Sequence, residues 1–301
     1  MVDLQDFQFR LEYAGLRLLA LIMRLLGVDR GAAVSAVLWR FFAPMTRRHK
    51  RALENLALAY PEKSAAEHRR IALAMWGNLG RVMAETMQID RILADPERLQ
   101  FANEALDRHY VGKLGSLIGV SLHTGNWEFA IWPMIRWGAH PGAVYRLVKN
   151  PYVDRYIRDQ RKALFPAGML AKGRDHEGSN LQGQRTARQL TSFVRRGGRL
   201  GLICDLYDKH GIATPFFGHD ARSTPVPAMI ARRVGSRIWM ARCIRLGERS
   251  QFRIEVKELK VRRTDRPSDD IRWITAEMQR QFETWIREYP EQWMWSNRRW
   301  S

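Results

Sequence analysis

The chain has 301 residues, of which 46% are hydrophobic and 27% charged, values that exclude a disordered, collagen-like or coiled-coil protein. Lys and Arg total 50 against 31 Asp and Glu, and the formal net charge of +19 predicts polyanionic partners: nucleic acid, anionic lipid or an acidic carrier protein. The two cysteines, Cys204 and Cys243, lack Cys-x-x-Cys or Cys/His spacing, which excludes a disulfide framework and predicts no metal site.

Residues 1–46 are predicted to form a helical segment that attaches the protein to a membrane. Two apolar stretches, 16–28 and 32–42, are interrupted or followed by basic residues, and no signal-peptide pattern precedes them. Both stretches are shorter than the roughly 20 clean apolar residues that a spanning helix needs. Spaced arginines suit a helix in the headgroup plane, so we expect peripheral or monotopic attachment to anionic lipid. A spanning segment with snorkelling arginines and a helix packed on the domain are the alternatives.

A second unit, residues 47–301, is expected to begin with a helical lead-in over 47–98. Apolar residues recur at helical spacing over 53–60, and a proline follows directly. Ser64, followed three residues later by Glu67, forms a capping-box pattern that predicts the start of a second helix.

After this lead-in, short β-rich runs alternate with amphipathic stretches. The expected strands are 116–122, 143–148, 200–206, 237–244 and 252–259. The expected helices are 130–137, 153–164, 181–195, 226–234 and 269–289. This alternation predicts an α/β fold with a central, mostly parallel sheet flanked by helices. Residues 252–259 alternate apolar and charged side chains, which predicts an edge strand with one solvated face.

The candidate catalytic residues lie where a buried strand ends at His123 and a helix starts near Asn126. Ligands of open α/β sheets bind at the carboxyl ends of strands, where this histidine falls. Glu128, in the first helical turn, is expected to hydrogen-bond one imidazole nitrogen and to leave the other free to accept a proton. No Gly-x-Ser-x-Gly turn accompanies the pair, so we expect direct activation of a substrate hydroxyl without a covalent intermediate. The alternative is a turn histidine beside a glutamate that only stabilises the helix dipole.

The sequence His-Thr-Gly-Asn-Trp-Glu at 123–128 resembles the HX4(D/E) motif of glycerolipid acyltransferases, and in this form that of the lipid A biosynthesis acyltransferases. Further blocks resemble the same family in the same order: 144–151, 202–208, 214–218, 223–225, 285–295 and 298–300. The resemblance therefore covers nearly the whole chain and implies a glycerolipid acyltransferase-like α/β fold.

The resemblance implies an enzyme that moves a fatty acyl chain from acyl carrier protein to a hydroxyl of a lipid A precursor, at the cytoplasmic face of the inner membrane. The phosphopantetheine of the carrier brings the acyl group, so the enzyme needs no cofactor of its own. His123 would be the general base, Glu128 would orient it, and Arg146 would contact the oxyanion. Carrier protein, glycolipid acceptor and anionic membrane lipid would together account for the positive charge.

Four polar residues are candidates for oxyanion or substrate binding, each with a structural alternative. Arg146 has an alternative partner in Asp154 or in a lipid phosphate. For Asn126 the role of a helix cap is favoured over a catalytic one, and for Asn150 the start of a helix or turn is favoured. Asp205, inside an apolar strand, needs a partner if it is buried and would then support the structure.

Clustered basic and aromatic residues suggest contacts with lipid. The candidates for binding lipid phosphate, or for a solvated basic helix face, are Lys172, Arg174, Arg185 and Arg188. The candidates for a membrane-interface belt, or for the core, are Trp293, Trp295 and Trp300.

Three other functions are alternatives to acyl transfer onto a lipid A precursor. In the first, the protein is an acyltransferase whose acceptor is a lysophospholipid, an ornithine lipid or another glycolipid. In the second, the protein is a non-catalytic membrane scaffold, against which the intact His123 and Glu128 argue. In the third it binds nucleic acid, which we do not expect, because the sequence has no helix-turn-helix, RNP or zinc-finger pattern and begins with an apolar region.

Overall fold

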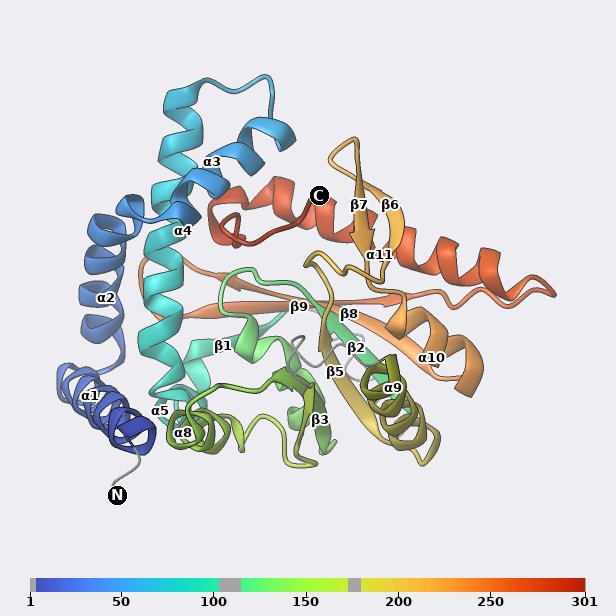
Figure 1. Ribbon diagram of the computed structural model, residues 1–301, viewed down its shortest axis with the longest axis horizontal. Helices are drawn as coiled ribbons and strands as arrows, with labels where there is room; N and C mark the ends of the chain where they lie inside the picture. Colours follow the sequence, from blue (N-terminus) through green and yellow to red (C-terminus); the bar gives the residue numbers. More distant parts are fainter. Residues whose placement is uncertain (1–3, 103–114, 173–179, 301) are drawn as a thin grey trace.

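The computed structural model of the chain describes residues 4–102, 115–172 and 180–300 and contains a seven-stranded sheet in the order β1-β9-β8-β2-β5-β3-β4 (Figure 1). In chain order its strands are β1 (Leu99–Phe101), β2 (Leu117–Ser121), β3 (Pro141–Arg146), β4 (Met169–Lys172), β5 (Arg199–Ile203), β8 (Arg237–Arg245) and β9 (Phe252–Leu259). A separate antiparallel hairpin is formed by β6 (Ile212–Phe216) and β7 (His219–Ser223).

Helices precede, connect and follow these strands. The α-helices are α1 (Leu4–Leu26), α2 (Val28–Phe42), α3 (Arg47–Ala59), α4 (Ala65–Thr86), α5 (Ile89–Leu93), α7 (Trp132–Arg136), α8 (Pro151–Arg161), α9 (Asn180–Arg195), α10 (Val226–Val234) and α11 (Pro267–Glu288). The short 3-10 helices are η1 (Ala43–Met45), η2 (Pro96–Arg98), η3 (Trp127–Ile131) and η4 (Pro290–Gln292).

The sheet is mostly parallel, and the predicted α/β class is therefore confirmed. Strand β2 lies at its centre, parallel to both β5 and β8, and only the β8–β9 pair is antiparallel. The carboxyl ends of β2, β3 and β5 consequently point to the same edge of the sheet. This edge is where an α/β fold assembles a ligand site.

The prediction that 252–259 forms an edge strand is wrong. Strand β9 lies between β8 and β1, because Leu99–Phe101 pairs in parallel with its first three residues, Phe252–Ile254. A three-residue strand is too short to produce a periodic pattern in the sequence, so β1 was not anticipated. The same holds for the short edge strand β4.

The sheet separates two apolar cores. Ile118 and Val120 of β2 face one core, which helices α9, α10 and α11 cover together with the last residues of the chain. Leu117 of the same strand faces the other core, which η3 and α7 cover. The alternation of side chains along a strand thus places α11 and η3 on opposite faces (Figure 1).

The helical lead-in begins as its sequence predicts. The Ser64 hydroxyl accepts a hydrogen bond from the Glu67 N–H at 3.3 Å, and the Glu67 carboxylate accepts one from the Ser64 N–H at 2.8 Å. This capping box satisfies backbone groups that the first turn of α4 would otherwise leave unpaired.

Helix α2 lies beside α4, and α1 packs against α2 and α8, away from the centre of the sheet (Figure 1). Helix α2 packs closely on α4: a Cβ on Gly80 would stand 2.7 Å from the Ser35 carbonyl oxygen, and the Ser35 hydroxyl donates to the Gly80 carbonyl at 2.6 Å. Among the residues that the structure describes, no helix combines the length and the apolar composition needed to cross a membrane. The proposed boundary at residue 46 stays a prediction.

Candidate active site

A cavity of about 960 Å³ opens at the carboxyl ends of β2, β3 and β5. His123, two residues after β2, lines it together with Arg146 at the end of β3 and Cys204 just after β5. Most of the lining is apolar, including Ala130, Ile131, Met134, Trp137, Phe165 and Trp239. The cavity is large enough for a ligand with a substantial hydrocarbon part.

His123 is held by Asp205, which follows the neighbouring strand β5. The imidazole Nδ1–H donates to Asp205 Oδ1 at 2.9 Å, and the His123 backbone N–H donates to Oδ2 at 2.8 Å. The carboxylate also accepts the indole N–H of Trp293, with Nε1 at 2.7 Å from Oδ2. Asp205 is fully buried, so it lies behind the histidine rather than in contact with a ligand.

The charge of Asp205 is maintained by these neighbours. Burial alone would raise the pKa of the Asp205 carboxyl, but the charge and hydrogen bonds of His123 and the hydrogen bond from Trp293 lower it below its ordinary value of 3.8. With Nδ1 bound to a carboxylate, the neutral imidazole exposes an unprotonated Nε2, which engages no hydrogen bond with the residues that the structure describes. The ring is thereby oriented as a proton acceptor.

The expected hydrogen bond between Glu128 and the imidazole is absent, and Asp205 provides it instead. Both carboxylate oxygens of Glu128 pair with Arg161 of α8, whose Nε lies 2.8 Å from Oε2 while its Nη2 binds Oε1. The Glu128 backbone N–H donates to the Asn126 side chain, so η3 begins at this turn and directs the Glu128 side chain toward α8. Both members of this ion pair line the cavity.

A glycine makes the turn after His123 possible. Gly125 has φ of 55°, and a Cβ at this position would stand 1.9 Å from the Cys243 carbonyl oxygen of β8. Any other residue would displace the turn from β8. The requirement explains why a glycine follows His-Thr in the sequence.

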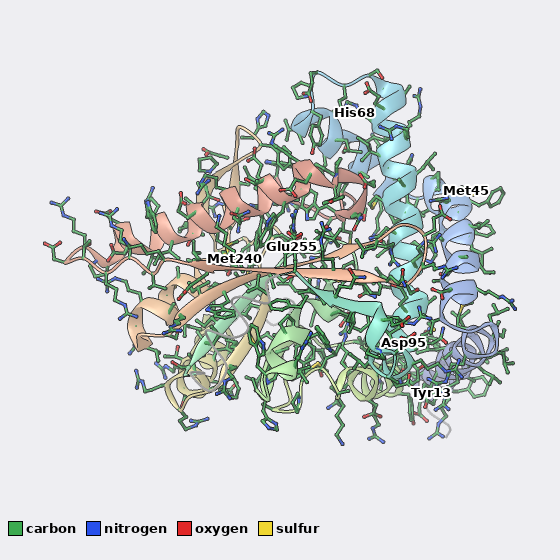
Figure 2. All side chains as sticks on the ribbon, turned by 180° about the vertical axis from the view of Figure 1, so that it is seen from behind. Tyr13, Met45, His68, Asp95, Met240 and Glu255 are labelled. Atoms are coloured by element: carbon green, nitrogen blue, oxygen red, sulfur yellow. The ribbon has the colours of Figure 1, made fainter. Side chains whose placement is uncertain are left out.

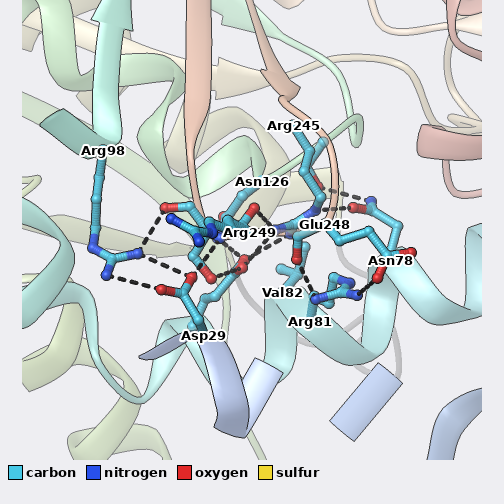
Figure 3. A network of polar contacts seen from close by, with 12 residues as sticks. Asp29, Asn78, Arg81, Val82, Arg98, Asn126, Arg245, Glu248 and Arg249 are labelled. Atoms are coloured by element: carbon cyan, nitrogen blue, oxygen red, sulfur yellow. Dashed lines mark hydrogen bonds and ion pairs between the residues drawn. The ribbon is translucent and has the colours of Figure 1, made fainter. Parts of the chain in front are cut away.

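Asn126 anchors the other end of the turn to a buried ion pair. Its side-chain amide donates to Glu85 of α4 at 2.9 Å, and Glu85 binds both terminal nitrogens of Arg245 at 2.6 and 2.8 Å. The Ser250 hydroxyl donates to the same carboxylate at 2.7 Å, and Arg245 also binds Asn78 (Figure 3). The helix-cap interpretation of Asn126 is confirmed.

The last residues of the chain form part of this site. The Met294 N–H donates to the His123 carbonyl at 3.1 Å, and the Gly125 N–H donates to the Gln292 carbonyl at 3.2 Å. Trp293 and Trp295 are 1% and 0% exposed. The interface-belt prediction is therefore wrong for these two residues, and the core alternative is right, because both indoles are buried in the core beside the turn after His123.

Of the predicted oxyanion and substrate residues, only Arg146 lines the cavity. Asn150 caps α8 by accepting the N–H groups of Tyr152 and Val153, and its amide donates to Phe9 and Glu12 of α1. Asn126, Asn150 and Asp205 are buried and do not line the cavity, and their predicted contact with substrate stays a prediction.

Of the predicted phosphate-binding residues, Arg188 has a described side chain, and their role stays a prediction. Arg188 is exposed on α9 and is not among the residues that line the cavity. Arg174 lies outside the described residues, as do the side chains of Lys172 and Arg185. Sequence reasoning missed Arg161, whose helical position gave no signal, and the turn at Lys209 and His210, which lines the cavity mouth.

Within the described ranges, no three His, Cys, Asp or Glu side chains gather to hold a metal ion. The site therefore presents acid–base and cationic groups: a carboxylate-bound histidine, a cavity arginine and a glutamate–arginine pair. An α/β fold with such a histidine in the lining of an apolar cavity is typical of an enzyme with a candidate acid–base group at its ligand site.

Residues 7–301 match the model of the bacterial lipid A biosynthesis acyltransferases, and the chain belongs to this family. The family resemblance of 123–128 and of the later blocks is thereby confirmed. The protein is an acyltransferase of lipid A, and hence of lipopolysaccharide, biosynthesis. A comparison with curated proteins returned no match.

Proposed function

We propose that the enzyme transfers a fatty acyl chain from the thioester of acyl carrier protein to a hydroxyl of a lipid A precursor. The observation that carries this proposal is that His123, held by a hydrogen bond to Asp205, lines the large apolar cavity. The cavity suits the hydrocarbon chain, and the imidazole suits the hydroxyl that attacks the thioester.

His123 acts as the general base in one proton cycle. Nε2 takes the proton of the acceptor hydroxyl as its oxygen bonds to the thioester carbonyl carbon, which forms a tetrahedral intermediate. The intermediate collapses by breaking the carbon–sulfur bond, and the imidazolium returns the proton to the departing phosphopantetheine thiolate. Asp205 keeps the imidazole in the required tautomer throughout.

Cationic side chains in the cavity stabilise the negative charge of the intermediate. Arg146 lines the cavity at the end of β3, on the same edge of the sheet as His123. Arg161, the last residue of α8, also lines the cavity and is held in place by Glu128. Removing one oxyanion donor from an acyl-transfer site costs about 2.7–4 kcal/mol in the barrier, which sets the scale for Arg146.

Attachment to the cytoplasmic face of the inner membrane is supported by the outer surface of α1 and α2. Helix α1 exposes an apolar row at helical spacing: Leu4, Phe7, Leu11, Leu18, Leu21 and Leu25. Helix α2 and η1 expose a second row: Val34, Val37, Phe41 and Met45. Tyr13 and Met45 lie near opposite ends of this side of the molecule (Figure 2). Such rows suit a helix pair lying in the plane of the bilayer surface.

Basic residues flank this apolar surface. Arg17 and Arg155 line a cleft between α1 and α8, and an exposed basic run, Arg47, Arg48, Lys50 and Arg51, opens α3 beyond Met45. Cations beside an exposed apolar face favour anionic lipid. The acidic carrier protein and the phosphates of the acceptor are further anions that the net charge of +19 would attract.

The test is a labelled acyl-transfer assay with lauroyl and myristoyl carrier protein, offering a tetraacylated lipid A precursor or a lysophospholipid. We expect transfer to the lipid A precursor, reduced by about 10²–10⁴-fold in His123→Ala. His210→Ala, which changes a second cavity histidine, is the matched control and should stay within a few-fold of wild type.

The assay separates the alternatives. Transfer to lysophospholipid alone would keep the chemistry and replace the acceptor. Folded protein without transfer to any lipid would favour the scaffold function. Cys204→Ser tests the direct mechanism, because an acyl-enzyme on the cavity cysteine would be lost in this variant. Unchanged activity in His123→Ala would overturn the mechanism.

A further inference from the structure

The carboxyl-terminal tail, residues 289–300, touches the catalytic pair more directly than its distance in sequence suggests. Trp293 pairs with Thr124 as an isolated β-bridge, and its indole N–H reaches Asp205 over 88 positions of sequence. The donor approaches the carboxylate oxygen opposite the one that accepts the imidazole, because Nδ1 binds Oδ1 and the indole binds Oδ2. Trp293 and His123 are therefore joined through one carboxylate.

The same tail buries a cation near this carboxylate. Arg299 is 0% exposed, and its guanidinium binds neutral groups in the described residues: the Ser223 hydroxyl, the Gln279 side chain and the Arg222 carbonyl. Gln279 in turn donates to the carbonyl of Cys204, the residue before Asp205. Burial lowers the pKa of Arg299 to about 10, and the negative charge of Asp205 opposes this effect.

A buried cation without a direct carboxylate partner is costly, so its nearest anion is informative. Gln279 links the Arg299 guanidinium to the backbone next to Asp205, and the Asp205 charge raises the pKa of Arg299 against the effect of burial. The Phe216 ring lies 4.3 Å from the Arg299 guanidinium carbon and 5.9 Å from the Trp293 ring. Little solvent screening is available in such surroundings.

We propose that the carboxyl-terminal tail is a working part of the catalytic site: the Trp293 N–H and the Arg299 charge draw negative charge away from the Asp205–His123 contact and so set the pH at which His123 becomes a base. The proposal rests on the proposed role of His123 as general base. Trp293 and Arg299 are positioning residues, since they act through Asp205 and not on the substrate.

The direction of the effect follows from electrostatics. When the Asp205 carboxylate loses a hydrogen-bond donor or a nearby cation, less of its negative charge is offset. Its attraction to the protonated imidazole is then stronger. His123 would then stay protonated to higher pH, and the acidic limb of the pH–rate profile would move upward. Among the described residues, the other ionisable groups that line the cavity with His123 are Glu128, Arg146, Arg161, Cys204, Tyr207, Asp208, Lys209 and His210. The variants below leave all of them in place.

The experiment is an NMR titration of the histidine side chains in the full-length protein, with His123 assigned through His123→Gln. In Trp293→Phe we expect the His123 midpoint to rise by about one pH unit, the size of effect that a hydrogen bond to a charged group commands. Trp295→Phe is the matched control, because its indole donates to the Pro290 carbonyl and not to Asp205. In Trp295→Phe, the midpoint of the His123 titration should equal that of the wild-type protein.

Arg299 gives an independent test of charge. Arg299→Met should raise the midpoint in the same direction, and Arg299→Lys, which keeps the charge, should restore it toward wild type. The acidic limb of kcat/KM should follow each midpoint, a change that a purely structural role would not produce. Equal midpoints in wild type, Trp293→Phe and Arg299→Met would overturn the proposal.

The titration keeps the proposal separate from the proposed function, because it needs no substrate. An enzyme without acyl transfer but with the expected midpoint shifts would overturn the function alone. If Trp293→Phe fails to fold, the wild-type indole N–H resonances decide the question: one of them should titrate with the His123 midpoint, and its absence would overturn the link.

Discussion

Two buried carboxylates hold the ends of the same turn, and they differ in what they face. Glu85 and Asp205 are both 0% exposed. Glu85 binds the guanidinium of Arg245 together with Ser250 and Asn126, all of them buried. Asp205 binds His123, whose imidazole lines a cavity.

The partner of each buried acid indicates its role. The ion pair between Glu85 and Arg245, with both carboxylate oxygens hydrogen-bonded, forms a rigid brace that holds Asn126 and the start of η3. Asp205 holds the proposed general base instead, so we expect it to affect the chemistry. Each of the two sites therefore predicts a different loss when its carboxylate is neutralised.

The largest effect is expected from Asp205→Asn. Its amide can satisfy the two donors at Oδ2 only by turning its own N–H toward Nδ1, which forces the proton onto Nε2 and removes the base. Acyl transfer should fall by about 10²–10⁴-fold while the fold persists. Asp208→Asn, in the cavity turn nearby, is the control and should stay within a few-fold of wild type.

Glu85→Gln should reverse this pattern by costing stability more than chemistry. Arg245 would lose its buried anionic partner, and the free energy of unfolding should fall by about 3–5 kcal/mol, measured by urea denaturation. Glu248→Gln removes the 86% exposed carboxylate that pairs with Arg81 and should change stability by less than about 0.5 kcal/mol. A loss of activity in folded Glu85→Gln as large as that in Asp205→Asn would contradict the distinction.

Glu128→Gln sharpens the comparison by testing the carboxylate that the motif itself supplies. Since Glu128 holds Arg161 and not the imidazole, we expect a loss of about tenfold in kcat/KM with an unchanged acidic limb. The pH–rate profile is the deciding measurement. If the acidic limb of the pH–rate profile moves in Glu128→Gln, the expectation is wrong and Glu128 orients His123.

The smallest effect concerns the outer helices, far from both carboxylates. Leu18→Glu on α1, where the leucine is 60% exposed, should weaken binding to vesicles containing anionic lipid by about tenfold in a flotation assay. Met229→Glu, which changes an apolar residue 48% exposed on α10, is the control. Equal binding of both variants would place the membrane contact elsewhere.

Local patterns in the sequence were sufficient to predict several ends of helices and strands and the family of this protein. The capping box at Ser64, the strand that ends at His123 and the cap at Asn126 each depend on residues a few positions apart, whose periodicity or hydrogen-bonding chemistry is visible in one dimension. The family blocks could be read for the same reason, because each of them is contiguous.

The residues that surround His123 come from distant parts of the chain, and they can be identified only from the tertiary structure. Asp205 lies 82 positions from His123, and β5 becomes the neighbour of β2 only once the strand order is known. From the sequence alone, Trp293 fits a membrane-interface belt and a core position equally well. In the structure it is buried, because the tail packs against the turn after His123. Contacts between distant segments depend on strand order and packing, which no local period encodes, and so the sequence was enough to single out His123, while its partner Asp205 became visible only in the fold.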